Sequence, residues 1–464
     1  MGAPPLVSVC VPTRNRAPLL AGALRSALAQ RGPDLEVLVH DDASTDATRS
    51  VVDALADRRV RYERSESALG VARARDRCLA TARGRYVAWL DSDDAYLPGA
   101  LARQVAVLEE HPRANMVHGG FHPVDEAGAR LPEWSAPFAQ DSIESGSVAL
   151  RHLIASNEVT TSTVVARRSA HAAAGPFGVG HRPSSSDWSM WLRLAIRGDV
   201  AYSAAPVARY RQHRATISHA AIADGERLRC DVAVVRELLR AEGVGTSPAT
   251  LATAYPALAA KAVLHAGDLL TAGRRAESMR AIGLAVRLAP GPLASLAPRL
   301  AWSVARGDDY GCYRATKAML ARLAARLDGT RFGLRIAAAG ARDPVWEAAL
   351  ARAAAIVRRV VPVGACVGAV TKWDPTLLAL SRRRGRNFPD RRTLPDGYPA
   401  DSAAAVAHLQ EQRNGGLSHL VFPSVSFWWL EHYRGLAAHL ESQHRRLWRD
   451  EDCVVYGLAA DGAA

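Results

Sequence analysis

Apolar and polar positions follow two distinct rhythms along the first hundred residues. Short runs rich in Val, Leu, Tyr and Trp predict buried strands, and longer segments with apolar residues at helical spacing predict helices. The predicted strands are 6–12, 35–44 (running into a turn), 59–65 and 86–90, and the predicted helices between them are 17–30, 46–57 and 70–83. Alternation of this kind predicts a mainly parallel sheet with helices on both of its faces.

The pattern changes twice further along the chain. Residues 100–218 are more broken, residues 220–328 read as almost continuous amphipathic helix, and strand signals return from residue 331. The later predicted strands are 334–341, 366–373, 419–425 and 453–458, with helices at 345–358, 401–413 and 427–444. We therefore expect an N-terminal α/β domain over 1–218, a helical linker or bundle over 219–330, and a smaller C-terminal α/β domain over 331–464.

Composition changes this picture little. The chain has 464 residues, of which 48% are hydrophobic and 23% are charged, as expected for a globular protein of more than one domain. Its formal charge is +13, but the only lysines are Lys261, Lys317 and Lys372, and the many arginines are spread along the chain. Without a compact basic block interleaved with aromatic residues, we expect no nucleic-acid partner.

The cysteines and the apolar runs of the sequence indicate where in the cell the protein would be found. The six cysteines are scattered singly with no CxxC pair, which argues against a zinc site or a disulfide framework and suits a reducing compartment. The N-terminus lacks the pattern of a signal peptide, and no apolar run approaches the roughly 20 residues that span a bilayer. We expect a cytoplasmic protein, and peripheral contact with a membrane stays open because Arg-rich helical faces are plentiful.

Candidate chemistry gathers where the predicted strands end. In open parallel sheets, ligands bind outside the carboxyl ends of the strands. The polar residues at those ends are Thr13, Asn15, Asp41, Asp42, Asp91 and Asp93. In an extended segment Asp91 and Asp93 point to the same side, so both can reach one divalent cation. Hard carboxylate ligands favour Mg²⁺ or Mn²⁺, with substrate phosphate oxygens completing the shell.

Four ordered motifs carry a family resemblance. They are "VSVCVPTRNR", "LEVLVHDDASTDAT", "GVARARDRCLATARGRYVAWLDSDDAYLPGAL" and "SDWSMWLRLA". In this order and spacing they resemble the inverting family-2 glycosyltransferases of the GT-A fold, over about residues 6 to 218. The resemblance implies a Rossmann-like nucleotide-binding domain that transfers a sugar from a nucleoside-diphosphate sugar.

The resemblance implies a set of nucleotide-sugar contacts. They are Pro12, Thr13, Asn15, Asp42, Arg75, Asp91 and Ser92. Asp42 would accept a hydrogen bond from the imide N–H of uracil or thymine, which favours UDP or dTDP as carrier. Two plainer interpretations stay open at this point: Asp41 and Asp42 as an Asx-type turn or helix cap, and Arg75 as a solvated arginine.

The resemblance also implies a base and metal ligands. Asp187 would remove the proton from the acceptor hydroxyl, although its position also suits an N-cap of the following helix. Asp93 and Asp91 would hold the cation, and His213 in "RYRQHRATIS" is a further metal or phosphate candidate. Two positions depart from the family pattern: Arg14 replaces an aromatic residue, and Ser186 replaces the Glu before the base.

Other side chains have two interpretations each. Thr161, Ser162 and Trp188 would line the acceptor pocket or only pack against a strand. The patch "FWWLEHY" would dock a partner or pack the core of its own domain, and we favour packing.

The sequence therefore predicts a metal-dependent inverting glycosyltransferase. Its acceptor would be a glycan, a lipid-linked molecule or a small molecule, in polysaccharide or glycoconjugate biosynthesis. A non-catalytic scaffold that binds a sugar nucleotide is the alternative, since a fold does not guarantee activity. A sugar-1-phosphate nucleotidyltransferase is disfavoured, because "PTRNRAPLL" lacks a Gly-rich phosphate loop with a lysine.

Overall fold

A computed structural model describes most of the chain. The described residues are 4–131, 140–178, 185–212, 226–240, 248–271, 273–306, 309–327, 330, 332–333, 336, 344–371, 374–390 and 398–458. The chain divides into two compact units, Met1–Leu258 with Gly329–Phe332, and Ala259–Asp328 with Gly333–Ala464. One boundary between the units falls inside a helix, so the three domains expected from the sequence stay a prediction.

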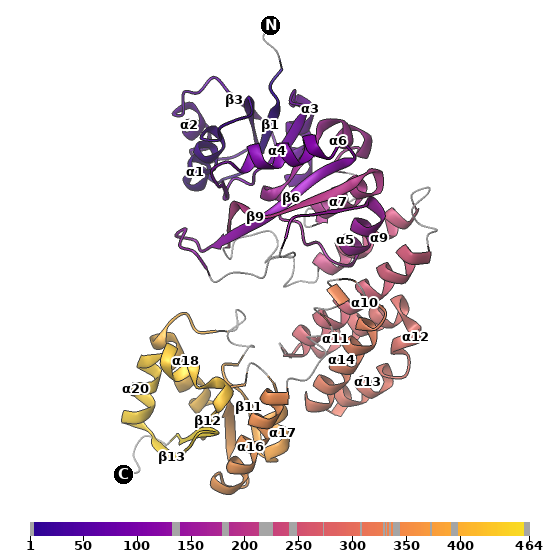
Figure 1. The fold of residues 1–464 in the computed structure, drawn as a ribbon. Coiled ribbons are helices and arrows are strands. Elements are labelled where there is room, and N and C mark those ends of the chain that lie inside the picture. The colour runs from indigo at the N-terminus through magenta and orange to yellow at the C-terminus, as the bar shows by residue number, and fades with distance from the viewer. Residues whose placement is uncertain are drawn as a thin grey trace. The chain divides into compact units, whose positions relative to one another are not determined.

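A nine-stranded sheet lies at the centre of the first unit (Figure 1). Its strands are β1 (Val7–Thr13), β2 (Leu35–Asp41), β3 (Val60–Arg64), β4 (Tyr86–Trp89), β5 (Ala95–Tyr96), β6 (Ala114–Val124), β7 (Ser142–Glu144), β8 (Val165–Arg167) and β9 (Asp199–Arg211). Their order is β3-β2-β1-β4-β8-β6-β9-β5, with β7 paired to β9. Because β3, β2, β1 and β4 are parallel neighbours, their carboxyl ends share one edge, as the sequence predicts.

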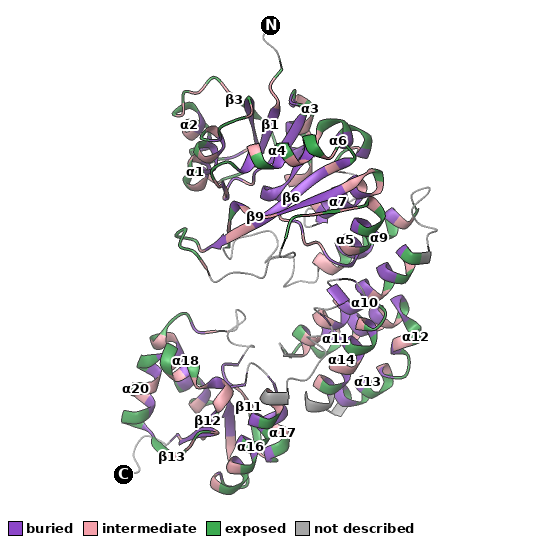
Figure 2. Ribbon diagram, in the orientation of Figure 1, coloured by how far each residue is buried: buried purple, intermediate pink, exposed green. Residues whose placement is uncertain are grey.

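Helices cover both faces of this sheet. The helical elements of this unit are α1 (Ala17–Leu28), α2 (Thr48–Asp53), α3 (Val71–Thr81), α4 (Ala100–Glu110), α5 (Gly146–Ala155), η1 (Thr161–Thr163, a 3-10 turn), α6 (Arg168–Ala174), α7 (Ser186–Arg197) and α9 (Glu226–Arg240). Leu24 of α1 and Leu101 of α4 pack in one core with Val9, while Cys78 of α3 donates to the Leu38 carbonyl on the other face. Every residue of β1 and β2 is buried, as expected for strands covered on both sides (Figure 2).

A buried carboxylate joins three elements at the amino-terminal edge of the sheet. Glu36 on β2 accepts hydrogen bonds from the Ser8 hydroxyl at 2.7 Å, from the backbone N–H of Arg83, and from the guanidinium groups of Arg83 and Arg61. Burial disfavours the charge, but these donors outweigh it and hold the pKa of Glu36 below its ordinary value. The carboxylate therefore stabilises the register of β1 and β2 when it is ionised.

The second unit begins with a run of helices. They are the later part of α10 (Pro248–Thr271), α11 (Arg275–Leu288), α12 (Pro290–Leu293), α13 (Ala297–Arg306) and α14 (Asp309–Ala324). This agrees with the helical region that the sequence predicts between residues 220 and 328. Among the described residues, no helix is both long enough and apolar enough to cross a membrane.

A smaller α/β sheet completes the second unit. Its strands are β10 (Cys366–Ala369), β11 (Arg384–Asn387), β12 (His419–Pro423), β13 (Arg445–Arg449) and β14 (Cys453–Gly457), in the order β11-β10-β12-β14-β13. Around it lie α16 (Pro344–Val360), α17 (Thr376–Ser381), α18 (Ser402–Asn414), η3 (Ser424–Ser426), α19 (Trp428–His432) and α20 (Arg434–Gln443). This confirms the predicted C-terminal α/β fold. The strand expected at 334–341 lies outside the described residues, apart from Ile336.

The helix predicted over 427–444 is two helices. They meet at Tyr433, whose hydroxyl donates to the Pro399 carbonyl at 2.9 Å and whose backbone leaves the helical region. Trp429 and Tyr433 are buried in the core of this sheet, as favoured from the sequence. Trp428 differs, because 38% of its surface remains exposed.

The Glu36 cluster yields a test of stability. Glu36→Gln removes the charge that two arginines and a hydroxyl share, so we expect a loss of about 2 kcal/mol in the free energy of unfolding near neutral pH. Because the folded pKa is lowered, the contribution of the carboxylate is present above the unfolded pKa and is lost as the pH falls through the folded pKa. The loss caused by the substitution should therefore shrink in acid, which chemical denaturation at several pH values measures.

The matched control is Glu63→Gln on the neighbouring strand, where the side chain is exposed. That substitution should change stability by less than about 0.5 kcal/mol. Equal effects of the two substitutions would contradict a structural role for Glu36.

Candidate active site

The acidic turn after β4 is anchored to two distant segments. The backbone N–H of Asp94 donates to the Asp91 carbonyl at 3.0 Å, which closes the turn. The Ser162 hydroxyl, on η1, donates to the Asp94 carboxylate and accepts from the backbone N–H of Asp91. The backbone N–H of Arg211, on β9, donates to the same carboxylate at 2.8 Å. Asp94 is therefore a buried anchor that joins β4, η1 and β9.

The other carboxylates of the turn are only partly buried and repel one another. Loss of hydration raises the pKa of Asp91, Arg75 opposes the shift, and repulsion from Asp93 and Asp187 adds to it. Burial, together with repulsion from Asp91 and Asp93, raises the pKa of Asp94 well above its ordinary value. An excess of negative charge therefore collects at this edge of the sheet, and it includes an acid from α7.

Arg75 on α3 faces this charge. Its side chain is only 7% exposed, and its NH2 group lies 3.3 Å from Asp91 Oδ1. The guanidinium carbon lies 5.8 Å from the centre of the Phe177 ring. Its Nε is buried without a hydrogen-bond partner among the described residues. The solvated alternative for Arg75 is therefore wrong, and a buried N–H without an acceptor is the kind of group that a ligand satisfies.

The residue after Arg75 fixes the loop that precedes α7. The Asp76 carboxylate accepts the backbone N–H groups of Phe177 at 2.6 Å and Gly178 at 3.1 Å. Phe177 in turn packs edge-on against Trp89 of β4. This acid therefore links α3 to the segment before the predicted base.

Asp187 lies in the first turn of α7, which begins at Ser186. The Thr161 hydroxyl donates to Asp187 Oδ2 at 3.4 Å, and the backbone N–H of Trp188 donates to Oδ1 at 2.6 Å. The N-cap position belongs to Ser185, whose hydroxyl donates to Asp231 of α9. The capping alternative for Asp187 is therefore wrong, and its negative charge is favoured by the amino-terminal end of the helix.

The two acids after β2 divide their tasks. Asp41 accepts the backbone N–H of Ser44 at 2.8 Å and the Tyr62 hydroxyl at 2.6 Å, so it is the Asx-type turn that the sequence suggested. Asp42 accepts the backbone N–H groups of Leu69 and Gly70 at 2.6 and 2.9 Å. Gly70 has a φ of +87°, which favours glycine, so the start of α3 is built around this carboxylate.

The remaining nucleotide candidates lie at the end of β1. The side-chain amide oxygen of Asn15 accepts the backbone N–H of Thr45 at 2.7 Å. The backbone N–H of Asn15 donates to the Ser44 hydroxyl. Thr13 is buried, and its hydroxyl has no partner among the described residues. Pro12 pairs in register with His40 inside β1, so the strand ends one residue later than predicted. Ser92 is buried within the acidic turn.

Known proteins match the part of the chain that carries these residues. The family model described as glycosyl transferase family 2 matches residues 8–152. A protein named as a teichuronic acid biosynthesis glycosyltransferase, TuaG of Bacillus subtilis, is 30% identical over 204 residues, which cover 43% of this chain and 75% of TuaG. The chain belongs to glycosyltransferase family 2.

Two further likenesses accompany this family membership. An uncharacterized protein of Mycobacterium tuberculosis is 31% identical over 223 residues, which cover 45% of this chain and 60% of that relative. The chain thus spans about 60% of the length of its mycobacterial relatives. The crystal structure of S. aureus TarS 1-349 in complex with UDP aligns at 17% identity with a TM-score of 0.49, covering 68% of this chain and 90% of that one.

Of the residues that the sequence suggested for this family 2 chain, Trp188 has another task and His213 lies outside the described residues, while Arg211 of β9 supports the acidic turn. Trp188 is fully buried and donates to the Leu153 carbonyl at 2.6 Å, so it packs inside the unit. The Arg211 side chain donates to backbone carbonyls of Asp93 and of the loop at 125–126. The predicted ligand His213 lies outside the described residues.

The donor atoms present fit a hard divalent cation only in part. Among the described residues, no group of three or more His, Cys, Asp or Glu side chains is arranged to hold a metal. Asp91 and Asp93 offer oxygen ligands in an environment with excess negative charge. Mg²⁺ and Mn²⁺ sites of this kind use one or two carboxylates and take their remaining ligands from water and substrate phosphates. The residues thus fit a cation that is shared with a bound diphosphate.

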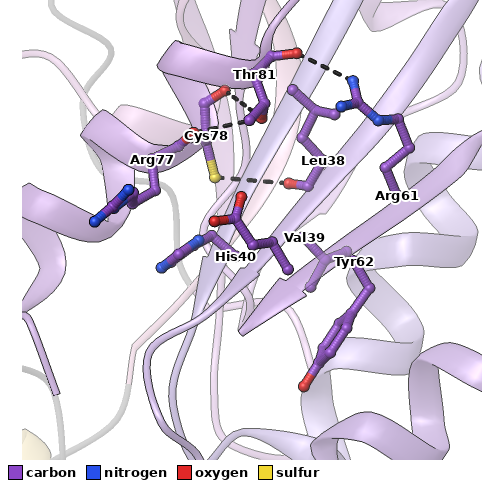
Figure 3. Close-up of a pocket in the computed structure, with 9 residues that line it drawn as sticks. Leu38, Val39, His40, Arg61, Tyr62, Arg77, Cys78 and Thr81 are labelled. Carbon is purple, nitrogen blue, oxygen red and sulfur yellow. Dashed lines mark hydrogen bonds between the residues drawn. The ribbon is translucent and has the colours of Figure 1, made fainter. Parts of the chain in front are cut away.

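A cavity of about 260 Å³ lies elsewhere in the unit, between β2, β3 and α3 (Figure 3). It is lined by Leu38, Val39, His40, Arg61, Tyr62, Glu63, Arg77, Cys78 and Thr81. Its walls are tied together, since Arg61 donates to the Thr81 carbonyl and Cys78 to the Leu38 carbonyl. None of these residues belongs to the acidic turn or to α7, so this cavity is separate from the candidate site.

Two connections in the site have no signal in the sequence. Ser162 was expected to line the acceptor pocket or pack a strand, and it instead supports the acidic turn. Asp76 in "GVARARD" had no role assigned from the sequence, and it holds a loop a hundred residues away. Both are long-range hydrogen bonds, which local pattern does not encode.

Repulsion at the acidic turn yields a test of stability. The pKa of Asp91 is raised in the folded protein above its value in the unfolded chain. Ionised Asp91 therefore lowers the free energy of unfolding once the pH has risen through the folded pKa. Asp91→Asn should therefore stabilise the metal-free protein near neutral pH by about 1 kcal/mol, a size common for relief of a destabilised site. The gain should disappear as the pH falls through the pKa of Asp91, because the native side chain then becomes neutral. Thermal unfolding in EDTA across a pH series measures both effects.

The matched control is Asp53→Asn on α2, which removes an exposed i,i+4 ion pair with Arg49. It should change stability by less than about 0.5 kcal/mol at every pH. Destabilisation by Asp91→Asn near neutral pH would show that Arg75 more than compensates the repulsion.

Proposed function

We propose that the first unit is a metal-dependent, inverting glycosyltransferase that moves a sugar from a UDP- or dTDP-sugar to an acceptor hydroxyl. One observation carries the proposal. Adjacent residues of η1 bind the two groups of acids. The Thr161 hydroxyl donates to Asp187 at 3.4 Å, and the Ser162 hydroxyl accepts the backbone N–H of Asp91 and donates to Asp94. A base and a diphosphate site across a small space are what this reaction requires.

The donor side is supported by unsatisfied polar atoms. The Arg75 Nε and the Thr13 hydroxyl are buried at the carboxyl ends of the strands and lack partners among the described residues. An arginine satisfied by a phosphate oxygen, in a site already rich in carboxylates, gives charge-assisted hydrogen bonds. Thr13 would contact the nucleoside, beside Pro12 and Asn15.

Asp42 would recognise the nucleobase of the donor. Both of its oxygens already accept one backbone N–H, but each carboxylate oxygen has a second lone pair. It can therefore accept an imide N–H as well, which uracil and thymine provide. This keeps UDP and dTDP as the favoured carriers.

A bound Mg²⁺ or Mn²⁺ would neutralise charge on the leaving diphosphate, held by Asp93 and Asp91, with His213 as a further candidate ligand. The protein supplies the rest. Arg75 would balance the acids and orient the phosphates, and Ser92 would line the donor site from within the turn.

Asp187 is placed to act as general base. Its carboxylate is oriented by the Thr161 hydroxyl and the Trp188 N–H, and its remaining lone pairs can accept the acceptor's proton. As the acceptor oxygen bonds to the anomeric carbon, the bond from that carbon to the phosphate oxygen breaks. The electron pair leaves with the diphosphate and the proton passes to Asp187. Attack from the face opposite the leaving group inverts the anomeric centre.

A glycan, lipid-linked or small-molecule acceptor, a cytoplasmic location and peripheral membrane contact all remain predictions. The name of TuaG ties that relative to teichuronic acid biosynthesis, and the succinoglycan biosynthesis protein ExoO of Rhizobium meliloti matches over 101 residues. Both names favour a polysaccharide or glycoconjugate as product. The second unit would be an accessory part of the same enzyme.

Substitution of the base tests the proposal. Asp187→Asn keeps the shape of the side chain but removes its basic lone pair, so sugar transfer or donor hydrolysis should fall by about 10²- to 10⁴-fold. UDP or dTDP affinity should stay within about threefold, because the base faces the acceptor. Product release from a panel of sugar nucleotides with Mn²⁺, and calorimetric titration, measure the two quantities.

Two further variants sharpen the result. Asp93→Asn should weaken Mn²⁺-dependent binding of UDP, while Glu110→Gln, on the exposed end of α4, should leave both activity and binding unchanged. Full activity in Asp187→Asn would refute the assigned base. A wild-type chain that binds UDP but turns over no donor would instead favour the sugar-nucleotide scaffold.

A further inference from the structure

The Phe177 ring lies against the Arg75 guanidinium and packs against two further elements. The guanidinium carbon is 5.8 Å from the centre of the ring. Trp89 of β4 packs edge-on against the ring at 4.9 Å between centroids, and Trp191 of α7 does so at 6.1 Å. The ring is fully buried. Because protein interiors are close-packed, the place of this ring depends on how the loop before α7 holds its backbone.

Asp76 holds that backbone. Its carboxylate accepts two consecutive N–H groups, those of Phe177 at 2.6 Å and of Gly178 at 3.1 Å. The approach is close: a Cβ atom added at Gly178 would lie 3.1 Å from Asp76 Oδ2 and 3.4 Å from Arg73 Cγ. Asp76 directly follows Arg75 on α3. One helix therefore carries both the arginine and the acid that fixes the ring against it.

The contacts around Arg75 form a closed circuit. They run from Asp76 through the Phe177 backbone and ring to Trp89. Along β4 they reach Asp91, two residues after Trp89, and Asp91 Oδ1 lies 3.3 Å from the NH2 group of Arg75. The guanidinium is thus held by a ring and by a carboxylate, while its Nε has no partner among the described residues.

We propose that Asp76 is a positioning residue, which acts through Phe177 to hold the Arg75 guanidinium in place for the donor diphosphate. The inference rests on the proposed function, which brings Arg75 to the phosphates, and it adds the residue that sets the position of the arginine. An aromatic ring against a guanidinium leaves the N–H groups at its edge free to donate to phosphate oxygens. Such bonds weaken steeply when they are misaligned, so a shifted loop would weaken donor binding.

Removal of the acid tests this role. Asp76→Ala leaves two N–H groups of the loop without their acceptor, so with Mn²⁺ present its affinity for UDP should fall about tenfold, as for one lost hydrogen bond to a charged group. Asp76→Asn keeps one acceptor oxygen, and its amide nitrogen cannot accept the second N–H. Its loss of affinity should therefore be smaller, about threefold. Titration calorimetry of the full chain, with dTDP in parallel, measures these constants.

A double-mutant cycle shows whether Asp76 acts through Arg75. Arg75→Gln removes the guanidinium and retains part of its stem. In that background, Asp76→Ala should weaken UDP binding by less than about twofold, because the group that it positions is already absent. Two residues that act on the ligand independently would instead give the same factor in both backgrounds.

Turnover provides a second readout. The value of kcat for donor hydrolysis should fall about 10²-fold in Asp76→Ala, since small errors in the position of a group at the reacting centre are costly. Asp76→Asn should recover part of this loss. Asp53→Ala, which removes an exposed carboxylate on α2, should leave affinity and kcat unchanged. Thermal unfolding of each variant reports whether the chain is folded, and Asp76→Asn carries the test if Asp76→Ala is not.

The outcomes separate the two proposals. Unchanged UDP affinity and kcat in folded Asp76→Ala or Asp76→Asn would overturn the positioning role, and so would the same loss of affinity in both backgrounds of the cycle. Wild-type binding and turnover would leave the proposed function standing in either case. A wild-type chain that binds neither UDP nor dTDP would overturn the proposed function, and the role of Asp76 with it.

Discussion

Carboxylates that repel one another at the carboxyl edge of a parallel sheet are the central constraint of the first unit. Asp91, Asp93 and Asp94 occupy one tight turn, and Asp187 approaches them from a different part of the chain. The cost of this arrangement is visible in the raised pKa values of Asp91 and Asp94. Perturbed carboxylates cluster at functional sites, so the turn indicates function more strongly than the cavity between β2, β3 and α3 does.

The structure keeps this turn rigid by attaching it to the fold from several sides. Ser162 binds both ends of the turn, and Arg211 holds it through backbone and side chain. Thr161 holds Asp187 by a hydrogen bond, and Asp76 holds the loop before α7 in the same way. Because these supports come from different elements, the distance between the two groups of acids depends on the packing of the whole unit. A transferase needs such rigidity to align the acceptor with the donor.

The acids near the nucleotide end show how structural and ligand-binding roles combine. Asp41 has both oxygens committed to the turn and to Tyr62, whereas Asp42 holds the start of α3 through single bonds that leave lone pairs free. Arg75 lies about one turn into that same helix. Asp42 therefore contributes to the position of the arginine that faces the acidic turn. The contacts to the nucleobase and to the phosphates of a nucleotide would be coupled through α3.

The periodicity of the chain determined the mainly parallel sheet, the helices between its strands, and the gathering of Thr13, Asp42, Asp91 and Asp93 at one edge, because strand ends follow from local apolar runs. It also predicted the helical region and the second α/β fold. Tertiary packing alone decided that Arg75 is buried, that Asp187 lies inside a helical turn rather than capping it, and that Trp428 is exposed while Trp429 is not. Those outcomes depend on hydrogen bonds and contacts between residues far apart in the chain, and a local pattern of apolar and polar positions carries no record of them.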